Sequence, residues 1–325
     1  MARKPRVHFP GALYHVISRG NQRQDIFLDD TDRTVYLSYL SECKGRFSIE
    51  LYAYALMRNH VHLLLEVHEK PLSRFMQSLL FRYARYFNKR YDKVGHLFQG
   101  RYRAILCDKD AYLLELVRYV HLNPIRAKIV SDLESYLWTS HLSYLGRAKQ
   151  EGLVEADFVL SQFGKKKSFA RRKYLEFILE ELDSGHQKKF YEVRDQRFLG
   201  EESFINRIED ERGGRERVVY DIPIEVIAKE VSKATGIALD RLYSLTYERG
   251  GAYGRGMVAY LARAEAGQMV KDIAEHFRRS PMRMSQAIIE FETRLRNDEL
   301  LRKIVDRLGE DLSKGAKKKY FITIA

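Results

Sequence analysis

Two histidines stand two positions apart in an otherwise apolar stretch, YALMRNHVHLLLE at residues 54–66. In a β-strand, residues i and i+2 point to the same face of the sheet. His60 and His62 would therefore present two imidazoles about 7 Å apart along the backbone. Two such nitrogens can converge on one metal ion. The alternative is a pair of semi-buried histidines satisfied by hydrogen bonds, and the pair alone does not exclude it.

A third ligand is needed to complete such a metal site, preferably an oxygen donor if the ion is Mg²⁺ or Mn²⁺. Tyr119 and Asn123 are four positions apart in RYVHLNP, which places them on one face of a helix. A tyrosine hydroxyl can attack a phosphodiester when a metal ion polarises the phosphate. The asparagine oxygen can join the metal shell beside it.

Other interpretations of these side chains stay open. Tyr119 lies near an apolar stripe and is one of 21 tyrosines, so a role in the core is a strong alternative. Tyr112 is the rival nucleophile, but Leu116, four residues later, cannot bind a metal. His121 and His96 are rival third ligands, and on a helix His121 would point away from the face of Tyr119.

The elements that must position these residues alternate between strand and helix patterns. We expect the order strand, helix, strand, strand, helix, strand, helix over residues 12–20, 29–47, 48–57, 60–68, 71–91, 97–108 and 110–123. This order predicts an α+β fold, a ferredoxin-like antiparallel sheet with packed helices. A tight turn at Arg58-Asn59 would join the middle two strands, and aromatic residues near 136–146 would close the core.

The rest of the chain has a different character. We expect a helical connector at 147–220 with a joint near Gly213-Gly214, because charged blocks alternate there with amphipathic pieces. Strand signals nearly vanish afterwards, which predicts an all-α domain at 221–312 and a loosely held basic tail at 313–325. The catalytic domain would then be residues 1–146.

The net charge of +13 is concentrated in the first half of the chain. Residues 1–150 hold 24 Lys and Arg against 14 Asp and Glu, whereas residues 151–325 hold 33 against 30. A basic surface favours encounter with a polyanion such as DNA. The two cysteines, distant from each other, and the absence of an apolar leader or membrane span indicate a cytoplasmic protein, which we expect to be bacterial and nucleoid-associated.

Several ordered motifs resemble a known family. RNHVHLLLE is similar to the His-hydrophobe-His signature of the HUH endonucleases, and other segments resemble the single-tyrosine transposases, particularly the REP-associated group: GALYHVISRGNQRQDIF, GHLFQGRYRAI, RYVHLNPIRAKIV and YLWTSHLSYLG. The resemblance covers about residues 7–146. One departure is Arg58-Asn59, where this group commonly has Pro-Asn, which changes the stiffness of the turn and not the ligand set.

The resemblance implies metal-dependent cleavage and rejoining of single-stranded DNA through a 5′-phosphotyrosine, in a domain that is often dimeric. By position, Tyr119 would be the nucleophile, and the ligands of a divalent Mg²⁺ or Mn²⁺ ion would be His60, His62 and Asn123. Single-stranded or hairpin DNA, including repeat palindromes, would be the partner.

Basic and aromatic residues alternate around these motifs. Guanidiniums that bind phosphates and aromatic rings that stack on bases suit single-stranded DNA. The candidate DNA contacts are Arg19, Arg23, Arg101 and Arg103, with Phe98 and Tyr102 interleaved. A solvated basic face is the alternative.

The stretch 267–295 has the pattern of a helix-turn-helix. Ser280 would cap a second helix that begins at Pro281 and presents Arg283, Ser285 and Gln286 to DNA. Residues 224–295 weakly resemble the DNA-binding domain of the bacterial replication initiator DnaA, although RRSPMRMS replaces its Gly-Gly-Arg-Asp-His turn. A plain helical bundle is the alternative.

Two other functions remain to be weighed against a transposase. One is a DNA-binding regulator whose nuclease site is vestigial or repurposed by the host. The other is a rolling-circle replication initiator, which usually carries a second tyrosine or a lysine near the nucleophile, or a helicase. The sequence has no GxxxxGK[ST] motif, which weighs against an attached helicase.

Overall fold

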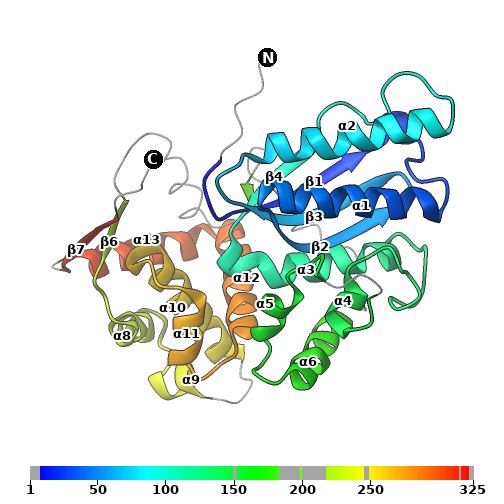
Figure 1. The fold of residues 1–325 in the computed structure, drawn as a ribbon. Helices are drawn as coiled ribbons and strands as arrows, with labels where there is room; N and C mark the ends of the chain where they lie inside the picture. The colour runs from blue at the N-terminus through cyan, green and yellow to red at the C-terminus, as the bar shows by residue number, and fades with distance from the viewer. Residues whose placement is uncertain are drawn as a thin grey trace. The chain divides into compact units, whose positions relative to one another are not determined.

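The computed structural model describes residues 8–148, 152–182, 198–199, 217–244, 249–314 and 316–321. Figure 1 shows the fold, which divides into two compact units. Unit 1 comprises residues 1–109 and 113–199, and unit 2 comprises residues 110–112 and 200–325. Unit 1 thus extends past the predicted boundary at 146. The predicted joint at Gly213-Gly214 lies outside the described residues.

Unit 1 is built on a sheet with the strand order β2-β3-β1-β4-β5. Its strands are β1 (Ala12–Arg19), β2 (Glu50–Met57), β3 (His60–Val67), β4 (Arg103–Cys107) and β5 (Phe198–Leu199). The first four pair antiparallel and β5 adds to β4 in parallel. This order confirms the predicted ferredoxin-like arrangement. Strand β4 starts six residues later than predicted, because the backbone before it turns through Gly100 at a φ of 62°.

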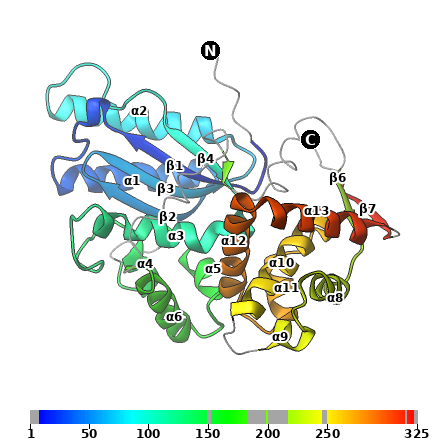
Figure 2. The same cartoon turned by 180° about the vertical axis from the view of Figure 1, so that it is seen from behind.

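Helices cover both faces of this sheet. α1 (Asp30–Phe47) and α2 (Leu72–Arg90) lie on one face, and α3 (Lys109–Arg126) lies on the other (Figures 1 and 2). A short 3₁₀ turn, Asn21–Arg23, follows β1. The side chains of β3 alternate between the two helical layers, so its even-numbered residues, which include both histidines, face α3. The described residues include no helix long and apolar enough to cross a membrane.

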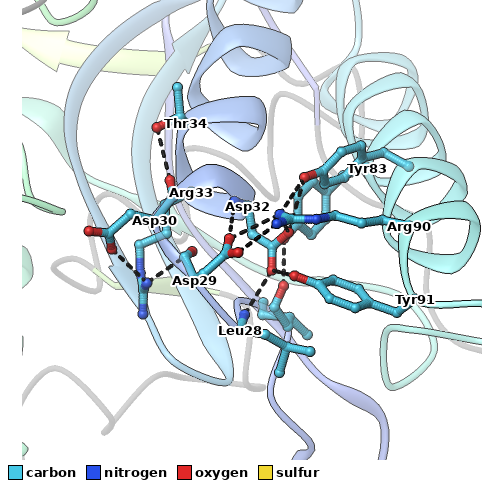
Figure 3. Close-up of polar contacts among 11 residues, drawn as sticks. Leu28, Asp29, Asp30, Asp32, Arg33, Thr34, Tyr83, Arg90 and Tyr91 are labelled. Carbon is cyan, nitrogen blue, oxygen red and sulfur yellow. Dashed lines mark hydrogen bonds and ion pairs between the residues drawn. The ribbon is translucent and has the colours of Figure 1, made fainter.

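The start of α1 is fastened to the end of α2 by a polar cluster (Figure 3). Asp29 caps α1 by accepting a hydrogen bond from the Asp32 backbone N–H at 3.0 Å. The fully buried Asp32 carboxylate accepts hydrogen bonds from the Leu28 N–H, the Tyr91 hydroxyl and Arg90 at 2.8, 2.9 and 2.7 Å. Arg90 also pairs with Asp29 at 2.6 Å. Arg90 is therefore paired with two carboxylates, although it lies at the basic end of α2.

Helix α3 is longer than predicted and is held by the helices that follow it. It runs through Pro124 to Arg126, three residues past the predicted end at residue 123. The helices α4 (His141–Leu145), α5 (Ala156–Ser161) and α6 (Lys167–Leu179) come after it in unit 1. The Tyr174 hydroxyl of α6 contacts His121 Nδ1 at 2.8 Å and His141 Nδ1 at 2.7 Å. His121 Nε2 contacts Ser140 Oγ at 2.7 Å. This buried network ties α3 to segments beyond residue 136.

Unit 2 is mostly helical. Its helices are α8 (Ile224–Thr235), α9 (Leu239–Tyr243), α10 (Arg249–Ala266), α11 (Val270–His276), α12 (Pro281–Asn297) and α13 (Glu299–Ser313). They surround an apolar core that includes Ile227, Met257, Ile273 and Phe291. Strand β6 (Arg217–Tyr220) pairs antiparallel with β7 (Lys318–Phe321). The predicted tail therefore contributes a strand to the unit.

Candidate functional site

The two histidines open strand β3 on the face that carries α3. Their ring centroids lie 5.0 Å apart with the planes at 74°. His60 is half-buried at the strand end, and His62 is 3% exposed. Both side chains therefore lie on one face of the strand, as residues i and i+2 do.

Burial keeps both imidazoles neutral. It lowers the pKa of His60 to about 4, with a further lowering by the Arg19 guanidinium. It lowers the pKa of His62 well below its ordinary value, helped by the positive charges that His15, His60 and Arg19 carry when protonated. A metal ligand must be unprotonated, and both rings meet that condition at neutral pH.

Hydrogen bonds orient the two rings in the same way. His60 Nδ1 lies 2.7 Å from Asn59 Oδ1, to which it donates. His62 Nδ1 lies 2.9 Å from Nε2 of His15 on the neighbouring strand. In the described part of the chain, the hydrogen bonds of both rings use Nδ1. Nε2 is then the atom of each ring that can bind an ion, a division of roles common to metal-binding histidines. The two Nε2 atoms are suitable ligands for a divalent cation.

Tyr119 comes to this site from helix α3. Its ring is 1% exposed and lies edge-on to two imidazoles, with centroid distances of 6.1 Å to His62 and 5.6 Å to His15. The predicted nucleophile and the histidine pair therefore meet on one face of the sheet. The alternative of a core tyrosine describes its burial but not its polar neighbours. The rival Tyr112 is also buried, about two turns earlier on α3.

Asn123 is half-buried one turn after Tyr119. Its side-chain nitrogen donates to the Tyr119 carbonyl oxygen at 2.9 Å, so its side-chain oxygen is the atom that remains for a cation. No hydrogen bond joins Asn123 to either histidine among the described residues. The structure thus brings together the histidines and Tyr119 and places Asn123 beside the latter.

Sequence reasoning missed two residues of this site. His15 of β1 is 2% exposed and stacks on His62 at a centroid distance of 5.2 Å. Arg126 lies over the Tyr119 ring, with 5.3 Å between its guanidinium carbon and the ring centroid. A lone histidine in an apolar strand has no spacing signal, and Arg126 lay beyond the expected helix end. The motif YHVIS, quoted only for its resemblance, was the available clue to His15.

Exposed arginines flank the histidine end of the sheet. In the strand register Arg19 lies opposite His60, and Arg103 lies opposite Ile17. The four candidate DNA contacts of this unit are all exposed: Arg19, Arg23, Arg101 and Arg103. Phe98 is half-buried, whereas Tyr102 is 9% exposed and has little ring surface to stack on a base.

A second polar cluster lies at the other end of β3. Glu50, Glu66 and His68 place ligand atoms within 4.8 Å of one another. The Tyr52 hydroxyl lies 2.7 Å from Glu50 and 2.6 Å from Glu66, and Lys109 pairs with Glu66 at 2.5 Å. Because a lysine ammonium already occupies Glu66, we interpret this cluster as an ion-pair network separate from the histidine site.

Helix α12 of unit 2 begins as predicted. Ser280 Oγ accepts a hydrogen bond from the Arg283 N–H at 3.3 Å, which caps the helix. Arg283 is exposed and Gln286 is half-exposed, so both present polar atoms to solvent. Ser285 is 4% exposed, because its position in the helix turns it toward the core. It is therefore placed for packing and not for contact with DNA.

Comparisons with known proteins agree with this fold. Residues 9–123 match the family model described as IS200-like transposase. The match includes the first four strands, the histidine pair, Tyr119 and Asn123. Over these residues, about a third of its length, the chain is similar to the IS200-like transposases.

Two solved structures also match parts of the chain. A REP-associated tyrosine transposase bound to a REP hairpin is 14% identical, with a TM-score of 0.39, over 48% of this chain and 90% of the other. A candidate transposase from Deinococcus radiodurans R1 is 20% identical, with a TM-score of 0.27, over 42% and 98%. No curated protein matches the chain.

Proposed function

We propose that this protein is a single-tyrosine HUH transposase that cleaves and rejoins single-stranded DNA. The observation that carries the proposal is the meeting of Tyr119 with His62 on one face of the sheet, at a centroid distance of 6.1 Å. Its burial among imidazoles supports a role for Tyr119 in chemistry on a phosphate in addition to packing. The exposed arginines at the same sheet end suit the DNA backbone.

The proposed reaction has two reversible steps. The Tyr119 oxygen attacks the phosphorus, a tyrosine-to-phosphate bond forms, and the bond to the 3′ oxygen breaks. The tyrosine loses its proton, the departing 3′ oxygen gains one, and a 5′-phosphotyrosine remains. In the second step the 3′-OH of another strand attacks this phosphate, loses its proton and forms a new phosphodiester that joins the two strands. The bond from phosphorus to the Tyr119 oxygen breaks, and that oxygen regains a proton.

Residues of this chain would bind the metal ion and the DNA and would hold the nucleophile for this reaction. His60 and His62 would hold a divalent Mg²⁺ or Mn²⁺ ion through Nε2, with the Asn123 oxygen as third ligand. Such an ion supplies positive charge that stabilises the phosphate as negative charge builds on it. Arg19 and Arg103 would bind neighbouring phosphates, and Arg126 would hold the ring of the nucleophile.

The test is covalent capture of DNA. The full chain is incubated with Mn²⁺ and a labelled hairpin that has single-stranded flanks taken from the DNA around its gene, and the adduct is separated under denaturing conditions. We expect the adduct with wild type and with the Tyr112→Phe control, and none with Tyr119→Phe. An adduct in Tyr119→Phe would show that another residue is the nucleophile. Duplex binding by a wild type that never forms an adduct would favour the non-catalytic regulator.

A further inference from the structure

His15 connects the metal site to the nucleophile. It lies on β1 next to β3, where residue 17 is directly opposite His62. Its ring stacks on His62 at 5.2 Å and meets Tyr119 edge-on at 5.6 Å. It is 2% exposed, so these two rings and the sheet determine its position. The proposed reaction gives this residue no step of its own.

The hydrogen bond between His15 and His62 can exist in two tautomeric forms, which differ in the ring that donates. His15 Nε2 and His62 Nδ1 lie 2.9 Å apart, a hydrogen bond that contains one proton. If His15 donates, His62 carries its own proton on Nε2 and cannot bind a metal there. If His62 donates from Nδ1, its Nε2 keeps a lone pair. The partner of one ring nitrogen thus decides what the other can do.

We propose that His15 is a positioning residue whose Nε2 accepts a hydrogen bond from the Nδ1–H of His62, which leaves the His62 Nε2 lone pair for the metal ion. Asn59 does the same for His60, since its Oδ1 can only accept. Each ligand ring would then donate a hydrogen bond from Nδ1–H, His60 to a side chain in the turn and His62 to a side chain of the neighbouring strand. The metal role of His62 rests on the proposed function, but its tautomer can be measured without metal or DNA.

The His15 ring also restricts the position of the Tyr119 side chain. The His15 ring is held by the hydrogen bond that its Nε2 accepts from His62 and by stacking on the His62 ring. Tyr119 packs its ring against the His15 ring at an interplanar angle of 76°. A substitution that frees the ring at position 15 would therefore disturb both the ligand and the nucleophile.

The first test uses metal-free wild-type protein. Long-range ¹H–¹⁵N spectra of the histidine rings report which nitrogen carries the proton. We expect His62 protonated on Nδ1 and His15 unprotonated on Nε2. A His62 protonated on Nε2 would overturn the proposal, whatever the protein does with DNA.

The second test measures Mn²⁺ binding to the full chain by calorimetry without DNA. The His15→Gln variant keeps an acceptor oxygen, and His15→Phe keeps a ring but has no acceptor. We expect a loss of about 10- to 100-fold in affinity for His15→Phe and near wild-type affinity for His15→Gln. Equal affinity in wild type and His15→Phe would overturn the proposal.

A control separates this inference from the proposed function. Mn²⁺ binding that survives in His62→Ala would show that the ion sits elsewhere, which contradicts the proposed metal site and leaves the tautomer measurement to decide the role of His15. Should His15→Phe fail to fold, the spectra of wild type and the affinity of His15→Gln still decide. A tenfold loss in His15→Gln would contradict the role of the acceptor.

Discussion

Arg126 holds its guanidinium carbon 5.3 Å from the centroid of the Tyr119 ring. The two residues are seven positions apart, so they lie on one face of α3. Arg126 also pairs with the Glu181 carboxylate at 3.5 Å, and Glu181 pairs with Arg118 as well. A buried carboxylate thus holds the cation that lies over the proposed nucleophile.

Replacement of Arg126 by alanine is expected to slow adduct formation by about tenfold. A desolvated cation–π contact is worth about 2 kcal/mol or less, and about 1.4 kcal/mol corresponds to a factor of ten in rate. The measurement is the single-turnover rate of adduct formation with Mn²⁺. Arg172→Ala, on the exposed side of α6, is the matched control and should keep the wild-type rate. Equal rates in both variants would exclude Arg126 from the site.

Removal of the Glu181 carboxylate should destabilise unit 1. Glu181 is 4% exposed, and Arg118 is 5% exposed. Arg118 keeps its other carboxylate partner, Glu115, at 2.5 Å, so the loss of the bonds to Glu181 should cost about 1–3 kcal/mol. Urea denaturation of Glu181→Ala should show this loss in the free energy of unfolding. Glu176→Ala breaks exposed pairs with Lys173 and Arg172 and should cost about 1 kcal/mol or less.

The sheet and its helices could be predicted from sequence because their signals are local. Asp29 precedes a helical pattern and caps α1 as expected. The histidine pair and the i, i+4 spacing of Tyr119 and Asn123 are also local signals. These signals sufficed for the order of elements along the chain, the face of the strand that carries the histidines and the helix that carries Tyr119.

The residues that prepare the site depend on contacts between distant segments. His15 meets His62 through the register of β1 on β3, which no spacing in either strand reveals. Glu181 follows a helix that we interpreted as part of a connector, yet it pairs with Arg126 of α3. The strand β7 was likewise hidden in a basic tail, since its partner β6 lies about a hundred residues earlier.

The buried histidines of unit 1 predict a loss of stability in mild acid. Burial lowers the pKa of His141 to about 4 and lowers the pKa of His121 well below its ordinary value. In the unfolded chain both titrate near the ordinary value of about 6.5. As the pH falls below that value, the unfolded chain binds protons that the folded chain does not, so the free energy of unfolding decreases toward pH 4.

The size of this acid effect can be bounded for one residue. For His141, a shift from 6.5 to about 4 corresponds to about 3 kcal/mol at 1.36 kcal/mol per pKa unit. Urea denaturation at pH 7.5 and pH 4.5 measures the difference. His141→Gln should lose less stability than wild type between these two pH values, because one titrating group is gone. An equal loss in both proteins would contradict the contribution of His141.

Helix α12 should bind duplex DNA through its exposed amino-terminal turns. Arg283 lies three residues after the capping Ser280, and its guanidinium is 3.5 Å from the Gln286 side-chain oxygen. We expect Arg283→Ala in the full chain to weaken duplex binding and to reduce the salt slope by about one. Ser285→Ala should leave binding unchanged, because Ser285 is 4% exposed.

The control for this prediction is an arginine of similar exposure on another helix. Arg307 of α13 is 84% exposed at its side chain and only weakly paired, with 3.9 Å to Asp311. Arg307→Ala removes one charge but none from α12. If Arg307→Ala weakens duplex binding as much as Arg283→Ala does, the loss of affinity reflects net charge. Helix α12 is then a helix of a plain bundle and does not contact DNA. A loss of duplex affinity in Arg283→Ala alone, together with a smaller salt slope, instead assigns a phosphate contact to α12. The salt slope depends only on the cations that contact DNA phosphates and displace counterions.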